Sequence, residues 1–184
     1  QANVEDFFRE KEMAFTPITF DTIGARTAAF EEDKCDSYTA DLSQLYAIRL
    51  KLKEPDKSVV LPEAISKEPL GPMIRRGDWE FFTIVRWVLN GIVEAEEYGL
   101  TKANVEKQKA ESKDPVVMRI LGTTEDTGKL LGLDKNWMFN AIKATGNYGE
   151  IFDRNVGPNS PLKLPRGLNN LWNKGGIMYA PPIR

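Results

Sequence analysis

Strand-like and helix-like segments alternate over the first third of the chain, and this alternation constrains the fold more than any other feature of the sequence. Short segments at 15–20 and 35–39 and an apolar segment at 58–61 predict strands. Helices are expected between them, over 21–33 and 41–52. Such alternation is typical of a parallel sheet covered by helices, because a parallel crossover needs a long connection. The sequence therefore predicts the α/β fold class.

One long apolar helix is predicted over 79–98, with Gly77 and Asp78 before it and Gly99 at its end. Its apolar side chains cover more than one stripe, so we expect the helix to be buried on several sides. Beyond residue 100 the pattern is mostly helical, with glycine- and proline-containing loops. The apolar residues of the long helix are Trp79, Phe81, Phe82, Ile84, Val85, Trp87, Val88, Leu89, Ile92 and Val93.

Charge and residue usage exclude several classes of protein. The 184 residues carry 25 basic and 27 acidic side chains, so the net charge of −2 gives no general attraction to nucleic acid. No apolar run is long enough to predict insertion into a membrane. The absence of histidine removes Ser-His-Asp and Cys-His catalysis and most catalytic zinc sites. We expect no metal and no cofactor.

The start of the chain and its one cysteine carry further information. The chain starts at Gln1 without a basic-then-apolar signal segment, so we expect a processed product, with any signal peptide removed, or a fragment. The helix-like residues at the start favour a fragment. Cys35 has no partner for a disulfide within the chain and on general grounds is a small buried apolar residue.

Asp41 is the strongest candidate for a binding residue. It ends the predicted strand at 35–39 and precedes a helix. Open α/β sheets hold small polar ligands at the carboxyl ends of their strands. A helix N-cap explains the same residue equally simply, and both roles can hold together. Thr39 is a weaker candidate for the same site.

Three blocks of sequence carry a family resemblance. The first holds CDSYTAD (35–41), LYAIR (45–49), VLPE (60–63) and ISKEPLGP (65–72). The second holds GD (77–78), IVRW (84–87) and AEE (95–97). The third holds GNYGE (146–150), SPLK (160–163), RGLN (166–169) and KGGIMYAPP (174–182). Together they resemble the general L-amino-acid-binding proteins of bacterial ABC importers, a branch of the type II periplasmic solute-binding proteins.

The resemblance implies part of a two-lobed Venus-flytrap receptor for polar L-amino acids, located in the periplasm and working with a membrane permease. Residues 1–64 resemble the later part of lobe two. Residues 65–99 resemble the return crossing with a strand and helix of lobe one. Residues 100–184 resemble a helical carboxyl-terminal extension that packs on lobe one. The resemblance also assigns the α-ammonium group of the ligand to Asp41.

The first half of the family pattern is absent from this chain. In the family that half supplies the arginine that binds the ligand's α-carboxylate. The resemblance implies that it also supplies a disulfide partner for Cys35. We therefore expect a carboxyl-terminal portion of a receptor, whose missing half is a separate chain or is replaced by a homo-oligomer partner.

Two other functions remain open from the sequence. One is a self-associating or partner-binding fragment with no ligand of its own. The other is an enzyme that cleaves cell-wall glycans with two carboxylates, drawn from Glu63, Glu68 and Glu150, because such chemistry needs no histidine. We expect a binding protein and not an enzyme.

Overall fold

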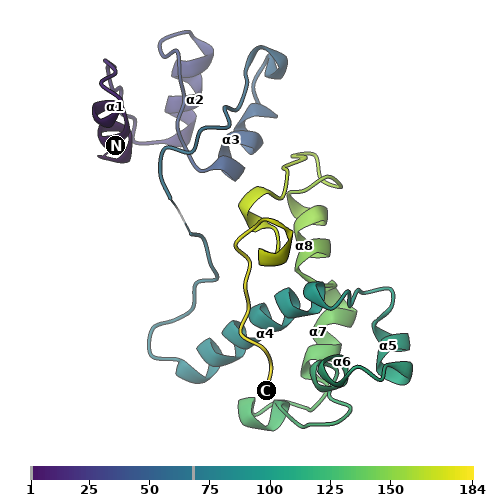
Figure 1. Ribbon diagram of the computed structural model, residues 1–184. Helices are drawn as coiled ribbons and strands as arrows, with labels where there is room; N and C mark the ends of the chain where they lie inside the picture. The colour runs from purple at the N-terminus through teal and green to yellow at the C-terminus, as the bar shows by residue number, and fades with distance from the viewer. Residues whose placement is uncertain (1, 68) are drawn as a thin grey trace. The chain divides into compact units, whose positions relative to one another are not determined.

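The computed structural model describes residues 2–67 and 69–184, and the described part consists of helices joined by turns and extended segments (Figure 1). The chain divides into two compact units, Gln1–Gly71 and Pro72–Arg184. The first unit contains α1 (Ala2–Glu10), α2 (Ile23–Glu31), α3 (Leu42–Arg49) and the 3-10 helix η1 (Pro55–Lys57). The second contains α4 (Trp79–Glu97), α5 (Val105–Glu111), α6 (Pro115–Ile120), η2 (Gly128–Leu131), α7 (Trp137–Thr145), α8 (Tyr148–Asn155), η3 (Gly167–Asn169) and η4 (Trp172–Lys174).

The strands predicted at 15–20, 35–39 and 58–61 are absent from the described part of the chain. These segments lie between helices, without backbone ladders. An apolar, β-branched run becomes a strand only when a neighbouring strand takes up its N–H and C=O groups. The described residues offer these segments no such neighbour. The α/β prediction is therefore not confirmed, and an isolated parallel bridge between Leu171 and Met178 is the pairing that the structure records.

The first unit is small and thinly packed. Its buried apolar side chains, among the described residues, are Ala29 and Leu52. The helix predicted to start at Asp21 begins with Thr22 as its N-cap, whose hydroxyl accepts a hydrogen bond from the Ala25 N–H (3.1 Å). The Arg49 guanidinium closes the end of α3 by donating from Nε to the carbonyl oxygen of Ser58 (2.7 Å). Side-chain to backbone bonds, more than a core, hold these turns.

Helix α4 confirms the long helix expected over 79–98. Asp78 caps its start, because Asp78 Oδ1 accepts from the Phe81 N–H (3.0 Å). Tyr98 and Gly99 end it, and Gly99 adopts a φ of +65°, a backbone conformation that favours glycine.

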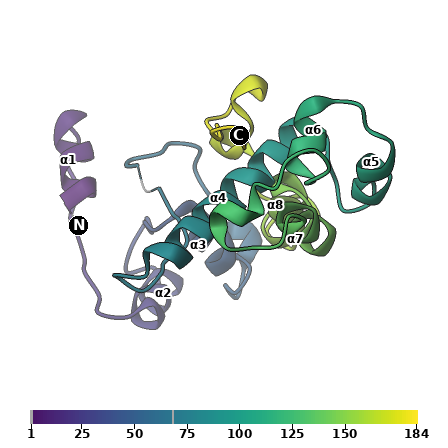
Figure 2. The ribbon, with the colours of Figure 1, turned by 90° about the horizontal axis from the view of Figure 1, so that it is seen from below.

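The second half of α4 is the centre of the second unit. Helix α4 packs against α7 and α8, and α5 packs against α6 and α7 (Figures 1 and 2). Local caps set the starts of the short helices, such as Asp114, which accepts from the Val116 and Val117 N–H groups at the start of α6. The buried cluster comprises Ile92, Ala95, Leu100, Val105, Val117, Ile120, Leu121, Trp137, Met138, Ile142 and Ile183.

Burial increases along α4. Residues 79–83 are exposed, whereas residues 91–95 are all buried. Between them Trp87, Val88 and Leu89 are partly buried and pack against the buried cluster. The helix was expected to be buried on several sides, and residues 91–95 meet this expectation whereas its first turn does not. Within the described residues, no helix has the length and apolar character that crossing a membrane demands.

Candidate functional site

Asp41 lies at the N-cap position of α3, but its side chain does not cap the helix. The Asp41 backbone carbonyl accepts from the Leu45 N–H (2.9 Å), whereas the carboxylate accepts no N–H of the first turn. Across residues 2–67 and 69–184, the half-buried Asp41 carboxylate has neither a hydrogen bond nor an ion pair. The capping explanation for Asp41 is therefore not realised in this structure, and the carboxylate is free to take a ligand cation.

The segment before Asp41 is held against α2 by an arginine. The Arg26 guanidinium lies over the Tyr38 ring, 4.6 Å from its centroid. Arg26 Nε donates to the Tyr38 hydroxyl (2.7 Å), and Arg26 Nη1 donates weakly to the Thr39 carbonyl oxygen (3.4 Å). The Phe30 ring meets Tyr38 edge-on at 5.9 Å. These contacts fix the backbone that carries Thr39 and Asp41, and sequence reasoning missed Arg26 because it lies on another element.

Thr39 and Cys35 lie on the same extended segment as Asp41 and differ in exposure. Thr39 is exposed, so its hydroxyl is accessible next to the Asp41 segment. Cys35 is a free, half-buried thiol. The structure brings these residues together on one extended segment, as their proximity in sequence requires.

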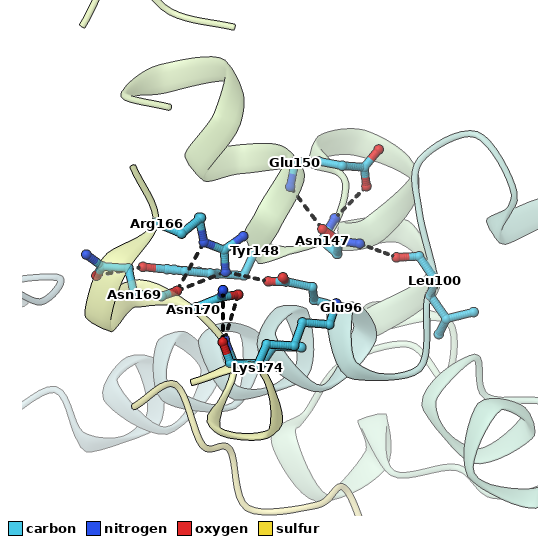
Figure 3. A network of polar contacts seen from close by, with 10 residues as sticks. Glu96, Leu100, Asn147, Tyr148, Glu150, Arg166, Asn169, Asn170 and Lys174 are labelled. Atoms are coloured by element: carbon cyan, nitrogen blue, oxygen red, sulfur yellow. Dashed lines mark hydrogen bonds and ion pairs between the residues drawn. The ribbon is translucent and has the colours of Figure 1, made fainter. Parts of the chain in front are cut away.

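A denser polar network lies in the second unit (Figure 3). Arg166 Nη2 pairs with Glu96 Oε2 at 3.0 Å, and both side chains are largely buried. The same guanidinium donates to the Asn169 carbonyl oxygen (2.8 Å) and lies 5.4 Å from the centroid of the Tyr148 ring. Arg166 Nε and Nη2 already have acceptors in Asn169 and Glu96. This network joins α4, α8 and η3, and we assign it a structural role.

Glu150, a candidate acid for glycan cleavage, has a structural role too. It forms a capping box at the start of α8, in which the Asn147 side chain accepts from the Glu150 N–H and Glu150 Oε2 accepts from the Asn147 N–H (2.9 Å). Glu150 Oε2 also accepts from the Lys102 N–H (3.0 Å). Glu63 is exposed in an extended segment, and Glu68 lies outside the described residues.

Two further carboxylates of α4 bind the carboxyl-terminal segment, which no sequence spacing indicated. Glu94 Oε2 accepts from the Ile183 N–H (3.0 Å) in a buried position. Glu97 Oε1 accepts from the Trp172 indole N–H (3.2 Å). Among the described residues no cluster of three or more His, Cys, Asp or Glu side chains could hold a metal ion.

Two small cavities lie in the second unit, and Asp41 lines neither. One of about 150 Å³ is lined by Pro72, Ile74, Phe82, Val85, Arg86 and Leu89. The other, of about 100 Å³, is lined by Trp87, Thr127, Leu130, Leu131, Trp137, Ile183 and Arg184.

Comparison with known proteins confirms the family resemblance. The chain superimposes on a solved ABC transporter periplasmic binding protein from Brucella ovis with glutathione bound, with a TM-score of 0.92 and 49% identity, covering 100% of this chain and 57% of that one. No protein-family model matches. By structure and sequence, the chain is homologous over its whole length to substrate-binding proteins of bacterial ABC transporters.

The curated relatives are named more narrowly. A putative amino-acid ABC transporter-binding protein of Escherichia coli K12, YhdW, is 52% identical over 184 residues. The general L-amino acid-binding periplasmic protein AapJ of Rhizobium johnstonii is 50% identical over 186 residues. The glutamate/glutamine/aspartate/asparagine-binding protein BztA of Rhodobacter capsulatus is 46% identical over 184 residues. The match takes in all of this chain but 54% of each relative, so the chain spans about half the length of the curated relatives it matches.

Proposed function

We propose that this chain is part of a periplasmic receptor that binds polar L-amino acids and delivers them to the permease of an ABC importer. The observation that carries the proposal is roughly 50% identity along the entire chain to proteins named as amino-acid-binding proteins. In this assignment the chain binds its ligand without catalysing a reaction, and it needs no cofactor.

The free carboxylate of Asp41 supplies the chemistry for this role. An amino acid carries an α-ammonium group, and a carboxylate is its natural partner in a partly dehydrated site. The absence of any protein partner for Asp41 among the described residues supports this role. Arg26, which holds the 38–39 backbone, would keep the carboxylate in place, and the Thr39 hydroxyl is a weaker additional contact.

The remaining assignments follow the same family. We assign residues 1–64 to lobe two, 65–99 to the return into lobe one, and 100–184 to an extension on lobe one. The boundary between Gly71 and Pro72 separates two compact units, and it is not the basis of this lobe assignment. In this proposal Cys35 pairs with a cysteine of the other half of the receptor.

The test replaces the matched residues of the Rhizobium relative with these 184 residues and measures amino-acid affinity by calorimetry. Asp41→Asn keeps a good N-cap residue but removes the charge. We expect affinity to fall tenfold or more, which is about 1.4 kcal/mol, since a charge-assisted hydrogen bond is lost.

The matched control is Asp36→Asn, at an exposed aspartate of the same segment, which should leave the affinity unchanged. If Asp41→Asn binds amino acids as tightly as the unsubstituted chimera, the site assignment is wrong. If the unsubstituted chimera binds no amino acid at all, the proposed function itself fails.

A second candidate function is partner binding without a ligand, either to the other half of a receptor or to another copy of this chain. The specific observation in its favour is the large exposed apolar surface, which includes Met73 at 97% and Trp79 at 71% exposure.

A further inference from the structure

Arg26 carries a half-buried positive charge that pairs with no carboxylate of the described residues. Its guanidinium donates from Nε to the Tyr38 hydroxyl (2.7 Å) and weakly from Nη1 to the Thr39 carbonyl oxygen (3.4 Å). Both acceptors are neutral, and Nη2 has no acceptor within residues 2–67 and 69–184. Because a guanidinium presents a planar fork of donors that matches a carboxylate, Arg26 can still take one anionic partner.

Asp41 is the opposite case in the same compact unit. Its half-buried carboxylate has no hydrogen bond and no ion pair in the part of the chain that the structure describes. Partly buried charges are ordinarily paired, because leaving water costs them solvation. Arg26 and Asp41 do not pair with each other, so one cation and one anion both remain open to a partner.

The distance between these two charges is limited by the chain that joins them. Arg26 Nη1 lies 3.4 Å from the Thr39 carbonyl oxygen. Thr39 and Asp41 are two residues apart, which is at most about 7 Å of extended chain. The guanidinium therefore lies within roughly 10 Å of the Asp41 backbone, and the exposed Thr39 belongs to the segment between them. A small ligand that carries both charges can reach from Asp41 to Arg26.

We propose that Arg26 is a specificity-determining residue that binds the side-chain carboxylate of the ligand, so that the site prefers acidic amino acids to their uncharged amides. The inference rests on the proposed function, in which Asp41 binds the α-ammonium group. Of the two carboxylates of an acidic amino acid, the one on the side chain reaches farther from the ammonium group. It is therefore the better match for two binding residues that do not touch each other.

The experiment uses the chimera in which these 184 residues replace the matched residues of the Rhizobium relative. Calorimetry measures its affinity for L-glutamate and L-glutamine, which have nearly the same shape and differ in side-chain charge. Arg26→Gln removes the cation and keeps a side chain that can donate to the Tyr38 hydroxyl. Lys51→Gln is the matched control, since Lys51 is an exposed cation of the same unit with no ion pair among the described residues.

We expect the unsubstituted chimera to bind glutamate about tenfold or more tighter than glutamine. Arg26→Gln should lower this ratio of affinities about tenfold or more, because a charge-assisted pair is lost for glutamate alone. Lys51→Gln should leave the ratio unchanged. Equal weakening of both ligands by Arg26→Gln would mean that Arg26 only holds the Tyr38–Thr39 backbone, and it overturns the inference. An unchanged ratio, as expected if a carboxylate of the other half of the receptor pairs with Arg26, overturns it as well.

Failure of the proposed function gives a different result. A chimera that binds neither amino acid contradicts the proposed function and the inference with it, whereas a chimera that binds both without discrimination by Arg26 contradicts the inference alone. Circular dichroism checks that the variants fold. If Arg26→Gln does not fold, Arg26→Lys decides the question. Lysine keeps the charge and loses the planar fork, so the ratio should fall about threefold or more, and an unchanged ratio overturns the inference.

Discussion

Glu94 is a carboxylate with 3% exposure inside the core of the second unit. Burial raises its pKa, and the charge of Glu97 adds to the rise. The hydrogen bond from the Ile183 N–H and the charges of Arg119 and Arg184 act in the opposite direction. Because the pKa is higher in the folded chain than in the unfolded chain, the folded chain holds this proton more tightly. The contribution of the protonated Glu94 to folding stability is fully present below the pKa that Glu94 has in the unfolded chain. It is lost as the pH rises through the pKa that Glu94 has in the folded chain.

Glu94→Gln should remove this pH dependence while keeping an oxygen that can accept from the Ile183 N–H. We expect the variant to gain stability relative to the unsubstituted chain as the pH is raised from about 4 to about 8. Urea unfolding at the two pH values, followed by circular dichroism, measures it. Glu94→Ala is the control and should lose about 1–3 kcal/mol, since it leaves a buried N–H unpaired. A stability difference for Glu94→Gln that is the same at both pH values would contradict the assignment.

Asp41 and the Arg166–Glu96 pair show which side-chain roles the sequence can predict and which it cannot. Asp41 could be identified as a candidate from the sequence because it lies between the 35–39 segment and a helix, and both are recognised from residues close to it in the chain. The sequence left the N-cap and ligand roles of Asp41 open, and the structure shows that its carboxylate makes no hydrogen bond to the first turn of α3. The Arg166–Glu96 pair joins residues seventy positions apart, so no local spacing could indicate it.

At the scale of elements, α4 and α7 approach closely at a glycine. A Cβ atom built on Gly91 would lie 3.3 Å from Ile183 Cδ1 and would overlap the buried Met138 side chain. The lack of a side chain at Gly91 therefore lets the two helices pack.

Gly91→Val should cost about 1–3 kcal/mol of unfolding free energy, because it forces extra atoms into a filled core. Gly24→Val in α2 is the matched control, since a Cβ there meets nothing within 4 Å, and it should change stability by less than about 0.5 kcal/mol. Thermal and urea unfolding of both variants measure the costs. Equal effects would mean that the close packing at Gly91 does not limit the α4–α7 contact.

The elements also differ in how well sequence predicts them. The helix expected over 79–98 is found as Trp79–Glu97, because Asp78 and Gly99 give it local start and stop signals. The strands expected at 15–20, 35–39 and 58–61 are not found. A helix satisfies its backbone hydrogen bonds within its own segment, whereas a strand depends on residues elsewhere in the molecule.

At the scale of the whole molecule, the two units differ in their share of buried apolar residues. The Gln1–Gly71 unit buries Ala29 and Leu52 among its described residues, whereas the Pro72–Arg184 unit contains the large cluster around α4 and α7. Local stability follows buried apolar contact, so the units should open independently.

We expect amides of α2 and α3 to exchange with solvent at least about tenfold faster than those of residues 91–97 and α7, since fewer buried contacts hold them. Hydrogen exchange followed by mass spectrometry measures this in the isolated chain. Uniform protection along the isolated chain would contradict the division into units of unequal stability.

The residue pattern was enough to predict the long helix with its local caps, the position of Asp41 at the start of a helix, and the resemblance to amino-acid receptors. These depend on neighbours a few residues apart, or on motifs kept in order along the chain. The packing of distant segments was needed to show that α4 is buried at residues 91–95 while its first turn is exposed, and that Glu94, Glu96 and Glu97 bind the carboxyl-terminal segment. Burial and long-range hydrogen bonds depend on which distant segments come into contact. A local pattern of residue types does not specify those contacts.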